Sequence, residues 1–249
     1  MKTTLTTPLR TLALCGLFGT IGAGCLSATV TLPYSNDFSS DADDFSAATG
    51  FTYDVGTYGE VYHYERGSSA TGLSLVDVTD LASPVDFTVS TSFTPLLVGA
   101  GRSFGFAVMS DAGSSEYLLV DWSTVNSLRL HEIGGAGLLN SNTGSITMTQ
   151  DAEYTLTFSG IYTDTVNKIM DLSFSVSDGT NTDTVTYSGF DATDLSGNTL
   201  VGYRAYGLYA NTVEFDNFSV SAIPEPSTLA LLLGAGMGAL VFVRRKPRL

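Results

Sequence analysis

Apolar and polar residues alternate with a period of two along most of the chain between residues 61 and 220. The pattern is clearest at 85–93, 104–108, 154–158 and 170–176, where Val, Leu, Phe and Met alternate with Ser, Thr and Asp. Because successive side chains of a strand point to opposite faces, the alternation predicts half-buried β-strands. The remaining predicted strands are 61–64, 73–78, 117–122, 128–133, 185–187, 203–209 and 213–220.

Two local signals refine these strands. Between 170–176 and 185–187 lies SDGTNTD, in which Asp178-Gly179 tolerates positive φ and predicts a hairpin. Within 213–220 the apolar residues change phase at Asp216-Asn217, which predicts a β-bulge.

Between residues 29 and 222 no stretch of ten or more residues has helical periodicity, and no repeat of 20 to 50 residues occurs. Many short strands separated by Gly, Asn and Asp turns are typical of an antiparallel two-sheet sandwich or jelly roll. We therefore predict an all-β fold for a single domain, 29–222, and disfavour a propeller or solenoid.

The N-terminus has the features of a signal peptide. A basic start is followed by an apolar run at 12–24, and the small residue Ala28 closes a plausible cleavage site. We expect 1–28 to be removed. Lipoprotein processing at Cys25 is the alternative, and Gly22 disfavours it because a lipobox carries an aliphatic residue there.

Both cysteines of the chain, Cys15 and Cys25, lie in this leader. After cleavage the exported protein would have no disulfide and no thiolate zinc site. Its stability must then come from the apolar core of the sandwich.

The charge of the chain is -14 at pH 7. All acidic residues except Glu225 fall within 29–222, whereas six of the basic residues lie in the two terminal segments, so the domain is more acidic than the whole chain. Such a surface repels phosphates, which argues against nucleic acid as a partner. It is compatible with calcium, with a salty habitat or simply with solubility.

The C-terminal segment 228–243 is apolar and contains neither charge nor proline. As a helix it would be about 24 Å long at ~1.5 Å per residue, somewhat short of the ~30 Å hydrocarbon core. The basic residues that follow can reach the head groups and favour the cytoplasmic side. We predict a transmembrane helix; the alternative, a buried amphipathic helix, lacks a recurring polar face.

Pro224-Glu225-Pro226, the apolar segment and the basic end with Arg244, Arg245 and Lys246 together resemble the PEP-CTERM sorting signal of bacterial exosortase substrates. The resemblance covers 223–249. It implies an exosortase as partner, transient anchoring in the inner membrane, and later release to the cell surface or extracellular matrix of a Gram-negative bacterium. It also implies an association with extracellular polysaccharide. An ordinary linker before a permanent anchor is the alternative.

The domain itself is similar to concanavalin A-like lectin and glucanase domains, including laminin G-like ones. The similarity rests on GFAVMSDAGSSEYLLVDW, EYTLTFSGIY, DLSFSVSDGTNTD and YGLYANTVEFDNFSVS, in that order. It implies a twisted jelly roll that often binds glycans and sometimes calcium. We expect a non-catalytic lectin-like or architectural module rather than an enzyme.

The alternative is a surface polysaccharide hydrolase, which needs two carboxyl groups about 5 to 10 Å apart. No Glu-x-Asp-x-x-Glu run occurs on one strand. The nearest candidates are Glu60 with Glu65, which face opposite sides of a regular strand, and Asp121 or Glu132. His63 and His131 are more plausibly ordinary strand residues than catalytic ones.

Three aromatic residues are candidates for contacts with a carbohydrate. Tyr62 and Tyr64 share one face of a predicted strand, and with Trp122 they could present flat surfaces to sugar rings. The competing interpretation is that they belong to the sheet core. No cofactor is expected, although a calcium site is left open because several aspartates, Asp111, Asp121, Asp191 and Asp194, lie in or near predicted loops. No metal ligand is assigned.

Overall fold

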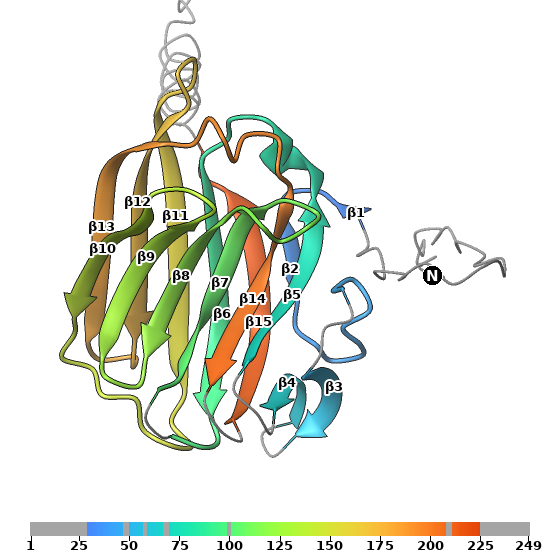
Figure 1. Ribbon diagram of the computed structural model, residues 1–249. Coiled ribbons are helices and arrows are strands. Elements are labelled where there is room, and N and C mark those ends of the chain that lie inside the picture. The colour runs from blue at the N-terminus through green and yellow to red at the C-terminus, as the bar shows by residue number, and fades with distance from the viewer. Residues whose placement is uncertain are drawn as a thin grey trace, which may run out of the picture.

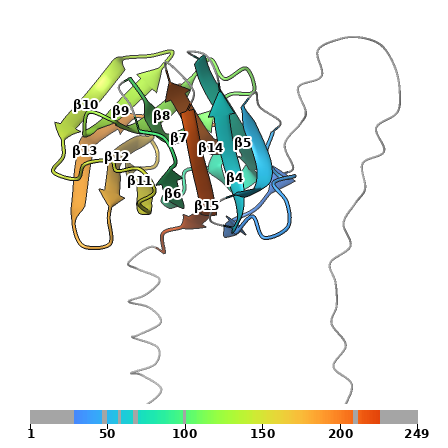
Figure 2. The ribbon, with the colours of Figure 1, turned by 90° about the horizontal axis from the view of Figure 1, so that it is seen from below.

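Two β-sheets lie face to face across one apolar core (Figure 1). The computed structural model describes residues 29–46, 50–56, 59–66, 70–98, 101–207 and 211–224. The two layers are seen edge-on in Figure 2. The predicted all-β sandwich is therefore confirmed.

The seven-stranded sheet has the strand order β1 (Thr29–Val30), β5 (Ala70–Val78), β14 (Leu200–Gly207), β7 (Ser103–Ser110), β8 (Tyr117–Ser123), β9 (Ser127–Ile133) and β10 (Gly137–Thr143). The eight-stranded sheet has the order β13 (Thr182–Asp191), β12 (Ile169–Ser177), β11 (Tyr154–Asp164), β6 (Phe87–Pro95), β15 (Asn211–Ala222), β4 (Gly59–Arg66) and β3 (Phe51–Gly56), with β2 (Tyr34–Asn36) paired to β15. All pairs are antiparallel except β1 with β5. A single 3₁₀ turn, η1 (Thr79–Ala82), is the one helical element in the described ranges.

The local predictions agree with this topology. Gly179 has φ 83° in the hairpin between β12 and β13. Along β15 the register with β6 shifts between Asp216 and Ser219, and Asn217 has φ 53°, which is the predicted bulge. The bulge restores the phase, because Phe215 before it and Phe218 after it are both fully buried.

The core is rich in aromatic side chains from both sheets. Tyr203 of β14 stacks on Phe215 of β15, with ring centroids 4.2 Å apart. The Tyr203 hydroxyl lies 2.9 Å from Thr91 Oγ1, and that threonine hydroxyl also donates to the Asp216 carbonyl oxygen at 2.7 Å. A buried tyrosine needs such a partner, so this hydroxyl chain ties the two layers together at the centre of the core.

The strands β10 and β13 close one side of the sandwich. The side-chain amide of Asn140 donates to the Thr186 carbonyl oxygen at 2.6 Å, and that of Asn142 donates to the Thr184 carbonyl oxygen at 2.9 Å. Edge strands with unpaired backbone groups invite pairing with other chains. These two amides occupy acceptors on β13 that would otherwise be open.

The predicted strands were found, but β1, β2, β3 and β10 were not anticipated. Strand β10 is mostly exposed and lacks an apolar alternation, so its sequence carries no period-two signal. The predicted signal peptide 1–28 and the predicted transmembrane helix 228–243 lie outside the described residues. Within the described ranges no helix is long and apolar enough to cross a membrane.

Candidate binding site

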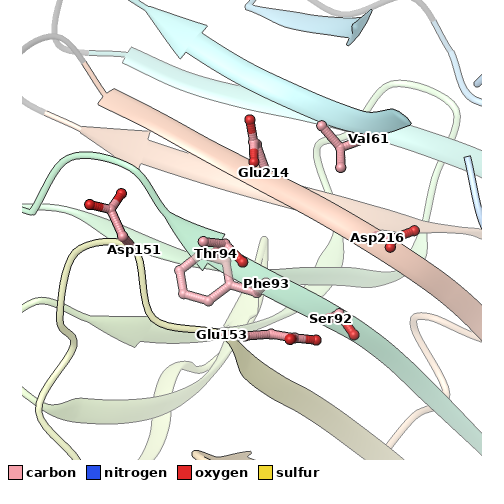
Figure 3. Close-up of a pocket in the computed structure, with 8 residues that line it drawn as sticks. All are labelled: Val61, Ser92, Phe93, Thr94, Asp151, Glu153, Glu214 and Asp216. Carbon is pink, nitrogen blue, oxygen red and sulfur yellow. The ribbon is translucent and has the colours of Figure 1, made fainter. Parts of the chain in front are cut away.

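A pocket of about 270 Å³ opens on the outer face of the eight-stranded sheet (Figure 3). Four carboxylates line it, together with two hydroxyl side chains and two apolar ones. The lining residues are Val61, Ser92, Phe93, Thr94, Asp151, Glu153, Glu214 and Asp216.

Strand alternation explains why acidic residues gather there. On β15 the core-facing Val213 and Phe215 alternate with Glu214 and Asp216, which therefore face outward. Figure 3 shows these two carboxylates projecting from one strand, while those of Asp151 and Glu153 come from the segment before β11.

Neighbouring strands supply the rest of the lining. Thr94 of β6 is the cross-strand partner of Glu214, and Ser92 is that of Asp216. The Asp151 backbone N–H donates to the Pro95 carbonyl oxygen at 2.9 Å, which fixes the segment before β11 beside the end of β6. The pocket thus combines parts of the chain that are far apart in sequence.

Burial and neighbouring charges perturb one of these carboxyl groups. Burial raises the pKa of Asp216, and the negative charges of Asp37 and Glu153 raise it further, against a hydrogen bond from the Asn217 backbone that lowers it. A carboxyl group of raised pKa beside ionised carboxylates can take up or release a proton more readily at mild pH than an isolated one.

A larger open groove of about 600 Å³ adjoins the pocket and shares Glu153 with it. Hydroxyl and amide side chains dominate the groove. Its polar members are Ser145, Thr147, Thr149, Thr180 and Asn181, together with the carboxylates of Glu153 and Asp178. Pocket and groove therefore meet at Glu153.

The predicted aromatic platform is wrong. Tyr62 is 4% exposed, Tyr64 and Trp122 are 0% exposed, and all three belong to the core. Trp122 packs edge-on against Tyr154 with ring centroids 4.9 Å apart, and the Tyr62 hydroxyl lies 2.6 Å from Ser74 Oγ. These rings offer no face to a sugar, because the opposite sheet covers them. The alternative stated from the sequence, that they are core residues, holds.

Among the carboxylates proposed for a hydrolase, the three whose side chains the structure describes do not form a pair. Glu65 is exposed on β4, where its Oε2 lies 3.7 Å from His63 Nε2. Glu132, at the end of β9 in the other sheet, accepts the Ala136 backbone N–H at 2.8 Å. The side chain of Glu60 lies outside the described part of the chain.

Asp121 is fully buried on the outer face of the seven-stranded sheet, where two arginines cover it. Arg129 donates from Nε at 2.7 Å and from Nη2 at 2.8 Å, and Arg204 donates from Nη1 at 2.8 Å. The Arg204 guanidinium also donates to Ser103 Oγ and lies 5.2 Å from the centroid of the Tyr206 ring. Asp121 is therefore an ion-pair partner rather than an accessible acid.

The predicted loop aspartates do not form a metal site. In the described residues no group of three or more His, Cys, Asp or Glu side chains is arranged to hold a metal ion. Asp111 instead accepts backbone N–H groups of Gly113, Ser115 and Glu116 and shapes its own turn. Asp191 likewise accepts the Thr193 N–H at 3.0 Å.

Strand β15 leads directly into the predicted sorting residues. The Ile223 backbone N–H donates to the Asp86 carbonyl oxygen at 2.8 Å, and Pro224 follows on the surface. Five predicted sorting residues, Glu225, Pro226, Arg244, Arg245 and Lys246, lie outside the described residues.

The chain carries a PEP-CTERM protein-sorting motif at residues 222–246. No curated protein sequence matches the chain. The motif starts at the last residue of β15, so it follows the sandwich without an intervening linker.

Several solved structures share the fold. A marine PL-14 alginate lyase from Aplysia kurodai superposes with a TM-score of 0.54 at 11% identity, covering 72% of this chain and 90% of that one. Lectin II from Ulex europaeus gives 0.53 at 11% identity, covering 78% and 99%. The GH43 BlXynB protein from Bacillus licheniformis gives 0.52 at 15% identity, covering 76% of this chain and 39% of that one. At these identities the likeness shows a lectin-like jelly roll and nothing more.

Sequence reasoning missed the acidic pocket, although part of its signal was visible. The alternation Val213-Glu214-Phe215-Asp216 places two carboxylates on one face of a strand. The contributions of Asp151 and Glu153 depend on how β6, β11 and β15 pair, which no local pattern reveals.

Proposed function

We propose that this chain is an exported, exosortase-sorted protein whose sandwich binds a carbohydrate without cleaving it. The observation that carries the proposal is the lining of the pocket, which combines four carboxylates with the hydroxyl groups of Ser92 and Thr94. Sugar hydroxyls donate hydrogen bonds to carboxylates and exchange hydrogen bonds with hydroxyl side chains. The adjoining polar groove offers room for neighbouring sugar units.

The negative charge of the pocket bears on the charge of the sugar that it can bind. Four carboxylates disfavour an acidic sugar at this position and favour a neutral, hydroxyl-rich one. The lectin among the structural neighbours shares the fold, which makes a binding role plausible for this sandwich.

The sorting motif supplies the location. We place the protein first in the inner membrane through its C-terminal segment and then, after cleavage by an exosortase, at the cell surface or in a matrix containing extracellular polysaccharide. Mass spectrometry of the protein from its own host tests this step. A mature chain that still ends in the basic tail would contradict release.

The binding role is tested on an array of neutral and acidic glycans, with the full chain in a mild detergent. Wild-type protein should bind neutral glycans saturably, and Glu153→Gln should lose that binding. Glu132→Gln is the matched control, because it removes one negative charge on the other sheet. Absence of neutral-glycan binding, or equal binding by both variants, would refute a role for the pocket.

A hydrolase is the second candidate, favoured by the raised pKa of Asp216 beside Glu153. It is tested by incubating the bound glycan with the protein and assaying new reducing ends. We expect none. Reducing ends that accumulate with wild-type protein and disappear with Asp216→Asn would replace the binding role by hydrolysis.

A further inference from the structure

The outer face of the seven-stranded sheet, opposite the acidic pocket, carries a row of charged residues. Cross-strand pairing places Arg204 of β14, Gly105 of β7, Asp121 of β8 and Arg129 of β9 side by side. All four alternate with core residues of their strands and therefore face outward. We call these four residues the arginine row.

Glycine at the centre makes the row continuous. Arg204 and Asp121 lie on strands separated by β7, yet Arg204 Nη1 reaches Asp121 Oδ2 at 2.8 Å. Because Gly105 has no side chain, the arginine can extend across β7. A Cβ at that position would lie 2.0 Å from the Val120 carbonyl oxygen.

The row has an excess of positive charge in a strongly acidic domain. Two guanidinium groups share the single carboxylate of Asp121, which leaves one net positive charge. Arg129 is 32% exposed and uses Nε and Nη2 for Asp121, which leaves Nη1 without a hydrogen-bond partner among the described residues. Arg204 is 12% exposed, and its Nε is a buried donor with no hydrogen-bond partner in the described residues.

Aromatic and imidazole side chains border the row. The half-buried Tyr206 ring packs on the Arg204 guanidinium, and Ser103, its partner on β7, accepts from the same arginine. On the other flank His131 of β9 lies next to the apolar Leu119 of β8. Burial lowers the pKa of His131, so it is neutral near pH 7 and offers hydrogen bonds without adding charge.

From this arrangement we infer that the arginine row is a second binding site, for the carboxylate of a uronic acid residue in an otherwise neutral polysaccharide. A planar carboxylate fits the unused part of the Arg129 guanidinium group, and the Tyr206 ring at the other end of the row can contact a sugar unit further along the chain. A single acidic sugar matches the single excess positive charge, whereas a dense polyanion would be repelled by the acidic surroundings. The site goes beyond the proposed function, because it lies on the opposite sheet and selects the opposite ligand charge.

Binding is measured by calorimetry with the full chain in a mild detergent. The probe is a disaccharide of one glucuronate and one N-acetylglucosamine, which carries a single carboxylate, and its carboxyl-reduced counterpart is the control ligand. Wild-type protein should bind the acidic probe about tenfold or more tightly than the reduced one, as expected for a charge-assisted hydrogen bond. Equal affinity for the two ligands, or no binding of the acidic probe, would overturn the inference.

Variants separate this site from a purely structural ion pair. Arg129→Gln should lose the preference for the acidic probe, while Asp121 keeps Arg204 as its partner and the protein stays folded by circular dichroism. Lys168→Gln is the matched control; it also removes one positive charge, from the β11–β12 turn, where Lys168 Nζ donates to Ser196 Oγ at 2.5 Å. It should keep the preference. If Arg129→Gln keeps the preference too, the row is structural only.

The two proposals can be refuted independently of each other. Loss of neutral-glycan binding in Glu153→Gln concerns the pocket alone, and loss of the acidic preference in Arg129→Gln concerns the arginine row alone. A protein that binds neither class of sugar refutes both proposals.

Discussion

Replacing Asp121 by asparagine is the most informative perturbation of the domain, because one buried carboxylate holds two arginines. The side chain of Asp121 is 0% exposed, and it accepts three charged hydrogen bonds of 2.7 to 2.8 Å. Asparagine retains one acceptor oxygen but turns an amide toward a guanidinium group. The buried Arg204, 12% exposed, then keeps its charge without compensation.

The magnitude follows from the burial of each partner. Removing one member of a buried ion pair costs about 3–5 kcal/mol, and the lower end applies because the one-third-exposed Arg129 can turn to water. Domains of about 150–250 residues lose about 2–4 °C in Tm for each kcal/mol. We therefore expect Asp121→Asn to unfold about 6–12 °C below wild type by calorimetry.

Double variants identify the residue responsible for the loss. Arg204→Met in the Asp121→Asn background removes the buried charge and should recover much of the Tm. Arg129→Gln in the same background removes a charge that water already stabilises and should recover little. A Tm loss under about 2 °C in the single variant, or equal recovery in both doubles, would refute this account of the ion pair.

Three further outcomes are expected. Gly105→Ala should lower the Tm by several degrees in thermal unfolding, because the new Cβ would meet the Val120 carbonyl oxygen of the next strand; an unchanged Tm would contradict the close packing. Asp216→Asn should raise the Tm at pH 7, because the folded-state pKa of Asp216 is raised and its ionised form therefore destabilises the fold. This gain in Tm over wild type should disappear as the pH falls and Asp216 becomes protonated. A gain in Tm that grows on acidification would contradict the raised pKa. The double variant Asn140→Ala and Asn142→Ala should aggregate faster than wild type in light scattering on mild heating, since it uncovers backbone acceptors at the sheet edge, and equal rates would show that the amides do not protect it.

The strands could be predicted from sequence because period-two alternation is a local property. It located β12 and the hairpin after it, and the phase change at Asp216 and Asn217 located the bulge. Strand β10 escaped prediction because both of its faces are largely open to solvent, so no apolar alternation marks it. Local patterns therefore predict a strand when at least one of its faces is buried.

The sites could not be predicted in the same way. Every residue of β8 is buried, so its sequence does not reveal that Trp122 faces the core while Asp121 faces the arginines. The pocket needs Glu214 and Glu153 to approach each other through β6, and the arginine row needs strands β14 and β9 to flank β7 and β8. These neighbours follow from the global topology, which pairs strands distant in sequence.

The central claim is that the acidic pocket holds a neutral sugar, and a crystal structure with the strongest neutral ligand from the glycan array tests it most directly. We expect the sugar to lie in the pocket, with its hydroxyl groups donating to Glu153 and Asp216. An oligosaccharide found elsewhere on the domain, with the pocket holding only water, would contradict the claim.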